Sequence, residues 1–138
     1  MQEKIKNFLI LSKSYLRKLF TGRLNRKNFF LSWLIIFSLL SIFLSIFSVL
    51  IILFGGDIDN IFSILGIVLL LILGWVILCS LLVRRAHDFN APAWNGIILI
   101  FIPFGFLYLL FKKGDAESNK YGNPPEHEFK FFKIILNK

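Results

Sequence analysis

The chain has 138 residues, of which 57% are hydrophobic and 17% charged, and its formal net charge is +8. A soluble domain of this length has too much surface for its volume to bury so many leucine, isoleucine and phenylalanine side chains. We therefore expect lipid to cover the remainder. The basic residues flank uncharged apolar runs, which favours anionic lipid headgroups as their partner and excludes nucleic acid.

The first predicted element is an amphipathic helix over residues 4–20. Its bulky apolar side chains recur at helical spacing, and its basic side chains fall on the opposite side. Such a helix lies flat in a membrane interface or packs on the protein's own cytoplasmic surface. Gly22 is suited to close it, and Asn25 is suited to cap the next helix.

Two membrane-spanning helices are predicted next, over residues 29–54 and 61–83. Neither range contains a charged residue, and each is long enough to cross a hydrocarbon core of about 30 Å. Small side chains on one face of the first span favour close helix packing: Ser38, Ser41, Ser45 and Ser48. Basic residues precede the first span and are absent from the turn after it, so we expect the N-terminus and residues 84–93 to be cytoplasmic.

Residues 94–111 form a third apolar run, interrupted by Pro103 and Gly105. We favour a straight third span with a proline kink, which would place the polar tail at 112–138 outside the cell. The alternative is a re-entrant hairpin broken at Pro103, which would return the tail to the cytoplasm. Two helices offer little protein to shelter such a broken backbone from lipid.

The sharpest polar cluster is Arg84-Arg85-x-His87-Asp88, in a loop predicted to follow the second span. If the helix continues through it, Arg84 and Asp88 lie one turn apart and are able to pair. The cluster is interpreted either as a positive-inside anchor with an acid-paired arginine or as a site for headgroup phosphates, which guanidinium groups bind well. The sequence contains no recognisable catalytic motif and too few clustered ligands for a metal.

In the tail, Asn119-x-Tyr121-Gly122 describes a fixed turn. If the tail is cytoplasmic, this turn is able to fold onto Arg84, Arg85 and His87 and close a polar site. If the tail is outside, the two motifs lie on opposite sides of the membrane.

These polar segments together resemble domain-of-unknown-function family 805, small bacterial inner-membrane proteins without an assigned activity. The resemblance covers roughly residues 20–125 and rests on the following motifs in order: Gly22-Arg23-x-x-Arg26-Lys27-x-Phe29-Phe30, then Arg84-Arg85-x-His87-Asp88 followed by Trp94, then Pro103, then Asn119-x-Tyr121-Gly122-x-x-Pro125. It implies a membrane location and a shared fold.

We therefore predict one all-α membrane domain over residues 1–138, multi-pass in a bacterial inner membrane with a cytoplasmic N-terminus. The expected function is non-enzymatic binding of lipid headgroups or a membrane partner through the cytoplasmic Arg84-Arg85-x-His87-Asp88 loop, with a second copy as one such partner and with no cofactor and no metal. The alternative is an oligomeric small-solute transporter or efflux component. Candidate binding residues are Arg84, Arg85, His87, Asp88, Trp94, Asn119, Tyr121, Arg23 and Arg26.

Overall fold

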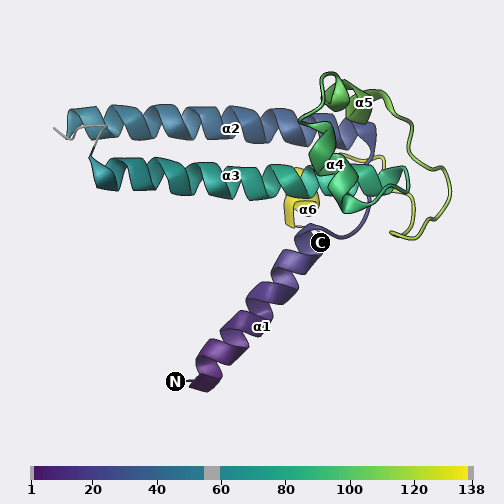
Figure 1. Cartoon of the computed structure of the whole chain (residues 1–138), viewed down its shortest axis with the longest axis horizontal. Helices are drawn as coiled ribbons and strands as arrows, with labels where there is room; N and C mark the ends of the chain where they lie inside the picture. Colours follow the sequence, from purple (N-terminus) through teal and green to yellow (C-terminus); the bar gives the residue numbers. More distant parts are fainter. Residues whose placement is uncertain (1, 55–59, 137–138) are drawn as a thin grey trace.

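The computed structural model describes residues 2–54 and 60–136, and this part of the chain is helical, without β-strands. Figure 1 shows two long helices side by side, with the shorter elements gathered mainly around one end of the pair. In chain order the helices are α1 (Gln2–Leu19), α2 (Arg26–Leu53), α3 (Ile61–Asp88), α4 (Ala93–Leu99), α5 (Gly105–Phe111) and α6 (Phe131–Leu136).

The antiparallel pair α2 and α3 consists of helices of 28 residues each, both long and apolar enough to cross a membrane. Only 6% of the most apolar stretch of each helix is buried inside the structure. The helices approach closely where α3 carries glycine: a Cβ at Gly66 would lie 2.7 Å from the Phe47 ring, and one at Gly74 would lie 2.9 Å from Leu40. Most of the large apolar side chains of the pair remain exposed.

Three of the four serines predicted on one face of α2 form hydrogen bonds within their own helix, and a role for this face in close helix packing stays a prediction. Ser41, Ser45 and Ser48 each donate to the carbonyl oxygen four residues earlier in their own helix. The buried face of α2 instead carries Asn28, Phe29, Ser32 and Ile36 near the helix start.

Both long helices extend beyond the apolar runs. Asn25 caps α2 as predicted, because its side chain accepts a hydrogen bond of 2.8 Å from the Asn28 backbone N–H. At the same end of the pair, α3 continues through Asp88. The Arg-Arg-x-His-Asp motif is therefore the last turn of a helix, which corrects the predicted loop.

The straight helix expected over residues 94–111 is replaced by α4 and α5, of seven residues each. Pro103 lacks the N–H that a continuing helix needs, and Phe104 has a left-handed φ of 63°. The chain then doubles back so tightly that a Cβ at Gly105 would lie 1.8 Å from the Leu99 carbonyl oxygen. Residues 93 and 111 thus lie at the same end of the α2–α3 pair, as in the re-entrant alternative.

The core lies at this end, where α2, α3, α4 and α5 meet. Phe29 is fully buried, and its ring centroid lies 6.0 Å from that of Phe106 on α5. Trp33 packs on the same ring at 4.7 Å. The fully or almost fully buried apolar side chains around them are Leu24, Leu81, Leu82 and Leu109.

The remaining helices flank the pair differently. Helix α1 projects away from it (Figure 1), which leaves the predicted interfacial position of residues 4–20 as a prediction. Helix α6 packs against the pair, with Ile134 buried. The C-terminal segment is thereby brought back beside the last turn of α3.

Candidate functional site

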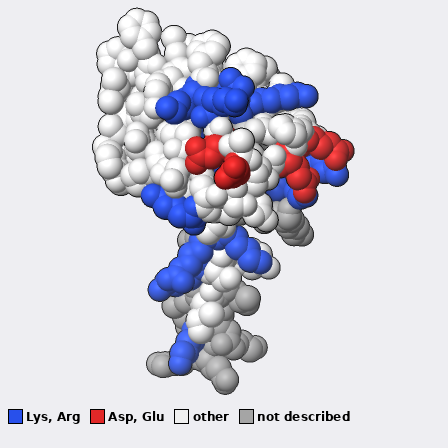
Figure 2. All heavy atoms as spheres, turned by 90° about the vertical axis from the view of Figure 1, so that its right-hand side faces the viewer, with Lys and Arg blue, Asp and Glu red and all other residues white. Residues whose placement is uncertain are grey.

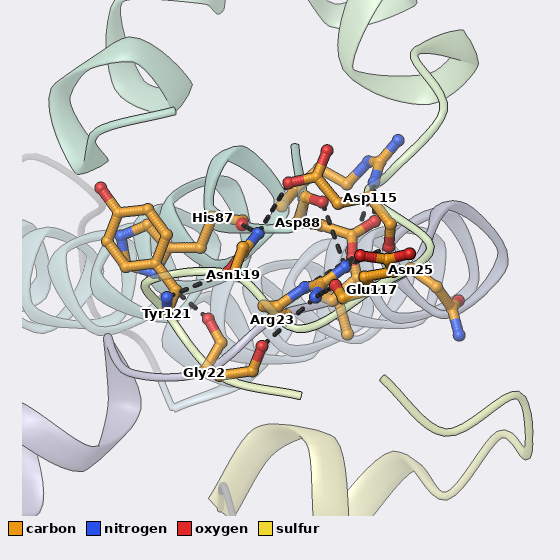
Figure 3. Close-up of polar contacts among 12 residues, drawn as sticks. Gly22, Arg23, Asn25, His87, Asp88, Asp115, Glu117, Asn119 and Tyr121 are labelled. Atoms are coloured by element: carbon orange, nitrogen blue, oxygen red, sulfur yellow. Dashed lines mark hydrogen bonds and ion pairs between the residues drawn. The ribbon is translucent and has the colours of Figure 1, made fainter. Parts of the chain in front are cut away.

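The polar end of the pair is organised around the buried carboxylate of Asp88 (Figure 3). Arg85, one helical turn earlier, donates to its Oδ2 atom over 2.6 Å. Arg23, from the segment between α1 and α2, approaches the Oδ1 atom at 3.2 Å. Two guanidinium groups thus share one carboxylate, a charge-assisted arrangement that fixes the 22–25 segment against α3.

Both guanidinium groups also bind backbone carbonyl oxygens from distant parts of the chain. Arg85 donates to Leu109 over 2.7 Å and to Lys112, at the end of α5. Arg23 donates to Glu117 over 2.6 Å and to Asp115, in the tail. Because loop carbonyl groups lack helix partners, these bonds satisfy them and hold α5 and the tail at the end of α3.

Arg84 differs from its neighbours. Helical spacing was expected to pair it with Asp88, but the acid pairs with Arg85 instead. The Arg84 guanidinium turns the other way and donates to the Ile134 carbonyl oxygen in α6. It has no carboxylate partner among the described residues, and its Nε atom and the Asn28 Oδ1 atom are buried without a hydrogen-bond partner.

The tail turn closes on His87. The Tyr121 ring stacks on the imidazole with a centroid distance of 3.7 Å and an interplanar angle of 9°. Asn119 donates from its amide to the His87 carbonyl oxygen over 3.0 Å, and its own oxygen accepts from the Tyr121 N–H. The two polar motifs that the sequence separates by some thirty residues are therefore one structure, as expected for a tail on the same side as the arginines.

The sequence analysis did not identify several residues that hold the tail against the α2–α3 pair. The Asp115 N–H donates to the Asp88 carbonyl oxygen over 2.7 Å, and a Cβ at Gly114 would lie 2.0 Å from Asp88 Oδ2. Asn28 donates to the carbonyl oxygens of Glu126 and Glu128, each over 3.2 Å. Gly114, Asp115, Glu126 and Glu128 act here through small size or backbone groups, which no sequence motif marks, and Asn28 acts through its side-chain amide.

Two of the predicted binding residues lie outside the buried cluster. Arg26 is exposed at the start of α2, where it reaches the Phe111 carbonyl oxygen at 3.4 Å. Trp94 is 61% exposed at the start of α4. Figure 2 shows Lys and Arg side chains stretching across this end of the molecule, with Asp and Glu side chains below them.

Two hollows open beside the cluster. One of about 300 Å³ lies between Arg26, Lys113, Asp115 and His127. The other, of about 210 Å³, is lined by basic, acidic and apolar side chains or backbone, namely Arg23, Leu24, Asn28, Arg84, Pro124, Pro125, Glu126, Glu128, Lys130, Lys133 and Ile134.

Two exposed ion pairs stand in the wall of the smaller hollow. Lys133 contacts Glu126, and its hydrogen bond lowers the pKa of that carboxyl group. Glu128 contacts Lys130 over 2.8 Å and raises the pKa of its ammonium group. No cluster of side chains suited to hold a metal ion occurs among the residues that the structure describes.

Fold and site together define an α-helical protein with two long apolar helices. Residues 22–28, 84–88 and 112–134, at one end of the pair, form a polar cap that buried arginines hold together. The family model for proteins of unknown function DUF805 matches residues 18–123, and the chain belongs to this family. No curated protein and no solved structure matches the chain.

Proposed function

We propose that the chain is a non-enzymatic integral protein of the bacterial inner membrane that binds anionic lipid headgroups with its polar cap, at the cytoplasmic side. The observation that carries this proposal is the position of exposed basic side chains at one end of a lipid-compatible helix pair. The Arg-Arg-x-His-Asp motif serves this function indirectly, by holding the cap together.

Exposure of the helix pair supports a membrane environment. Phe43, Leu53 and Leu73 are 59%, 73% and 62% exposed, and they lie on both long helices. A soluble monomer rarely exposes a contiguous apolar surface of such length, because its hydration is unfavourable. Hydrocarbon chains around α2 and α3 remove this cost, and the polar cap then lies at the headgroup level.

The charge distribution supports the choice of lipid. Arg26 and Lys27 begin α2, directly before its apolar length, and Lys112 and Lys113 follow α5 at the same end of the pair. Basic residues at this height attract anionic headgroups by about 1 kcal/mol each. The exposed indole of Trp94 is suited to the same depth, where amphipathic aromatic rings gather.

Several of the residues predicted to bind lipid are buried, so exposed side chains near them are better placed to contact it. Arg85 is fully buried, and Arg23 and Asp88 are at least 95% buried. Their hydrogen bonds go to protein groups, so a headgroup does not need to be present for the cluster to form. The proposal therefore assigns lipid contact to the exposed side chains around the cluster, with Arg26 as the principal one.

The test is lipid retention by the full chain in mild detergent, followed by native mass spectrometry with phosphatidylglycerol and with phosphatidylcholine. We expect the anionic lipid to be preferred, and Arg26→Gln to reduce that preference about fivefold, from about 1 kcal/mol for one interfacial charge. Lys120→Gln is the comparison variant: it also removes one exposed charge, but from the tail turn and not from the start of an apolar helix, so we expect it to reduce the preference less. Equal retention of both lipids by the native chain refutes the proposal.

A further inference from the structure

Arg84 is a buried cation whose charge the described residues leave unmatched. Arg84 is 5% exposed, and its single hydrogen bond in the described part of the chain goes to the uncharged Ile134 carbonyl group. The one buried carboxylate among the described residues, Asp88, carries a single charge that Arg23 and Arg85 already share, so it does not balance Arg84. Burying an ion without a counter-charge is costly, so such a group points to an anion that completes its surroundings.

The Arg84 side chain borders the hollow of about 210 Å³ between α2, α3 and the segment at 124–134. This volume is below the range of about 300–1,000 Å³ in which drug-sized ligands bind, but it exceeds the space of several water molecules at about 30 Å³ each. The hollow is therefore suited to a small polar group.

The wall supplies further donors for an anion. Lys130 and Lys133 line the hollow together with Arg84. Glu126 and Glu128 oppose an anion, but each is paired with one of these lysines. After that pairing, Arg84 remains without a carboxylate partner among the described residues, and Arg23, also in the wall, shares the single charge of Asp88 with Arg85.

We propose that this hollow, named here the Arg84 pocket, binds the phosphate group of an anionic ligand, with Arg84 as the buried counter-charge and Lys130 and Lys133 at the rim. The planar guanidinium fork and the ammonium groups are the donors that phosphate oxygens prefer. The inference deepens the proposed function, because the phosphate belongs either to a lipid headgroup or to a soluble phosphate monoester.

Contact with α6 alone does not account for Arg84. A guanidinium at the end of a helix stabilises its last carbonyl groups, and Arg84 does so for Ile134. That role uses one N–H group and leaves the buried Nε–H without an acceptor and the guanidinium without a carboxylate partner among the described residues. Charge neutralisation on the rim therefore separates the two roles, since it changes affinity for an anion without removing the hydrogen bond from Arg84 to Ile134.

The experiment titrates the full chain in micelles with inorganic phosphate, with glycerol 3-phosphate and with short-chain phosphatidylglycerol, and measures saturable binding by calorimetry. We expect Arg84→Gln to weaken binding at least about tenfold, the effect of losing one charged hydrogen bond. The double variant Glu126→Gln, Glu128→Gln frees both lysines and is expected to strengthen binding about threefold or more. Glu117→Gln, an exposed acid of the tail outside this pocket, is the control and leaves affinity within about twofold.

Saturable binding of the soluble phosphates assigns the pocket to a phosphate monoester, and binding of phosphatidylglycerol alone assigns it to a headgroup. The inference is overturned if no phosphate compound binds with one-to-one saturation, or if Arg84→Gln binds as the native chain does. Should Arg84→Gln fail to fold, equal affinities of the Glu126→Gln, Glu128→Gln variant and the Glu117→Gln control overturn it instead. Phosphate binding without lipid preference would refute the proposed function and leave the pocket standing.

Discussion

Neutralising Asp88 is the most informative perturbation of the cap. Its two carboxylate oxygens contact different guanidinium groups, Oδ1 with Arg23 and Oδ2 with Arg85. Asp88→Asn retains the volume and one acceptor oxygen but removes the charge. The substituted amide nitrogen would then point its hydrogens at one of the two arginines, where only donors face it.

The magnitude follows from burial. Arg85 is fully buried and the Arg23 side chain has no exposed surface, so neither charge gains much solvation when its partner is lost. Removing one partner of a buried ion pair costs about 3–5 kcal/mol, because the other charge is left uncompensated. The backbone carbonyl groups that both arginines also bind offset part of this cost. We expect Asp88→Asn to lower the free energy of unfolding by about 3 kcal/mol.

The assay is reversible unfolding of the full chain in mixed micelles by increasing the fraction of denaturing detergent. Asp115→Asn is the control, because this exposed carboxylate accepts a single hydrogen bond from Asn119 in the same turn. Its expected effect is about 1 kcal/mol or less. If Asp88→Asn unfolds within about 1 kcal/mol of the native chain, the buried cluster does not hold the cap and the reasoning from burial fails.

Three further predictions test the closure of the cap. Gly114→Ala places a Cβ against the buried carboxylate and should destabilise the chain by about 1–3 kcal/mol in the same unfolding assay. Tyr121→Ala removes the ring stacked on His87 and should cost about 1 kcal/mol, whereas Tyr121→Phe keeps the ring and should cost less than half of that. In a chain whose native cysteine is replaced, Ser118→Cys and Asn60→Cys should react with an impermeant maleimide from opposite sides of the membrane. Labelling of both positions from the same side contradicts the returning tail.

Much of the fold could be predicted because long uncharged runs have few structural solutions. The apolar runs at 29–54 and 61–83 predicted the two long helices, and Asn25 predicted where the first of them begins. The last turn of α3 was wrongly predicted to be a loop, because four polar residues follow an apolar run there. They remain helical because the fold buries them and satisfies their side chains with backbone carbonyl groups.

The third apolar run shows where periodicity is insufficient. Pro103 and Gly105 indicated a break, but a kinked span and a reversal contain the same residues. The reversal depends on the close packing of Gly105 against Leu99 and on carbonyl groups of α5 that bind Arg85. The contact of Gly105 with Leu99 is local, but the bond from Arg85 to Leu109 joins residues 24 positions apart, and no local pattern encodes it.

The sequence predicted which residues belong to the site better than it predicted the contacts among them. The tail turn was expected to meet Arg84, Arg85 and His87 if the tail returned, and the structure brings Asn119 and Tyr121 onto His87. The pairing of Asp88 with Arg85 was missed because positions three and four apart on a helix are both neighbours. Tertiary contacts decide between them, and Arg84 is drawn away by α6.

The extent of the family match separates two parts of the cap. Residues 18–123 begin just before Arg23 and end just after Gly122, so they contain every residue of the cluster around Asp88. Helix α6 and the rim lysines of the Arg84 pocket lie beyond that range. A chain that keeps the cluster but lacks the segment after residue 123 would still close the tail turn on His87, because those bonds come from Asn119 and Tyr121. It would lose the partner of Arg84, so the cap and its phosphate pocket are separable by truncation as well as by substitution.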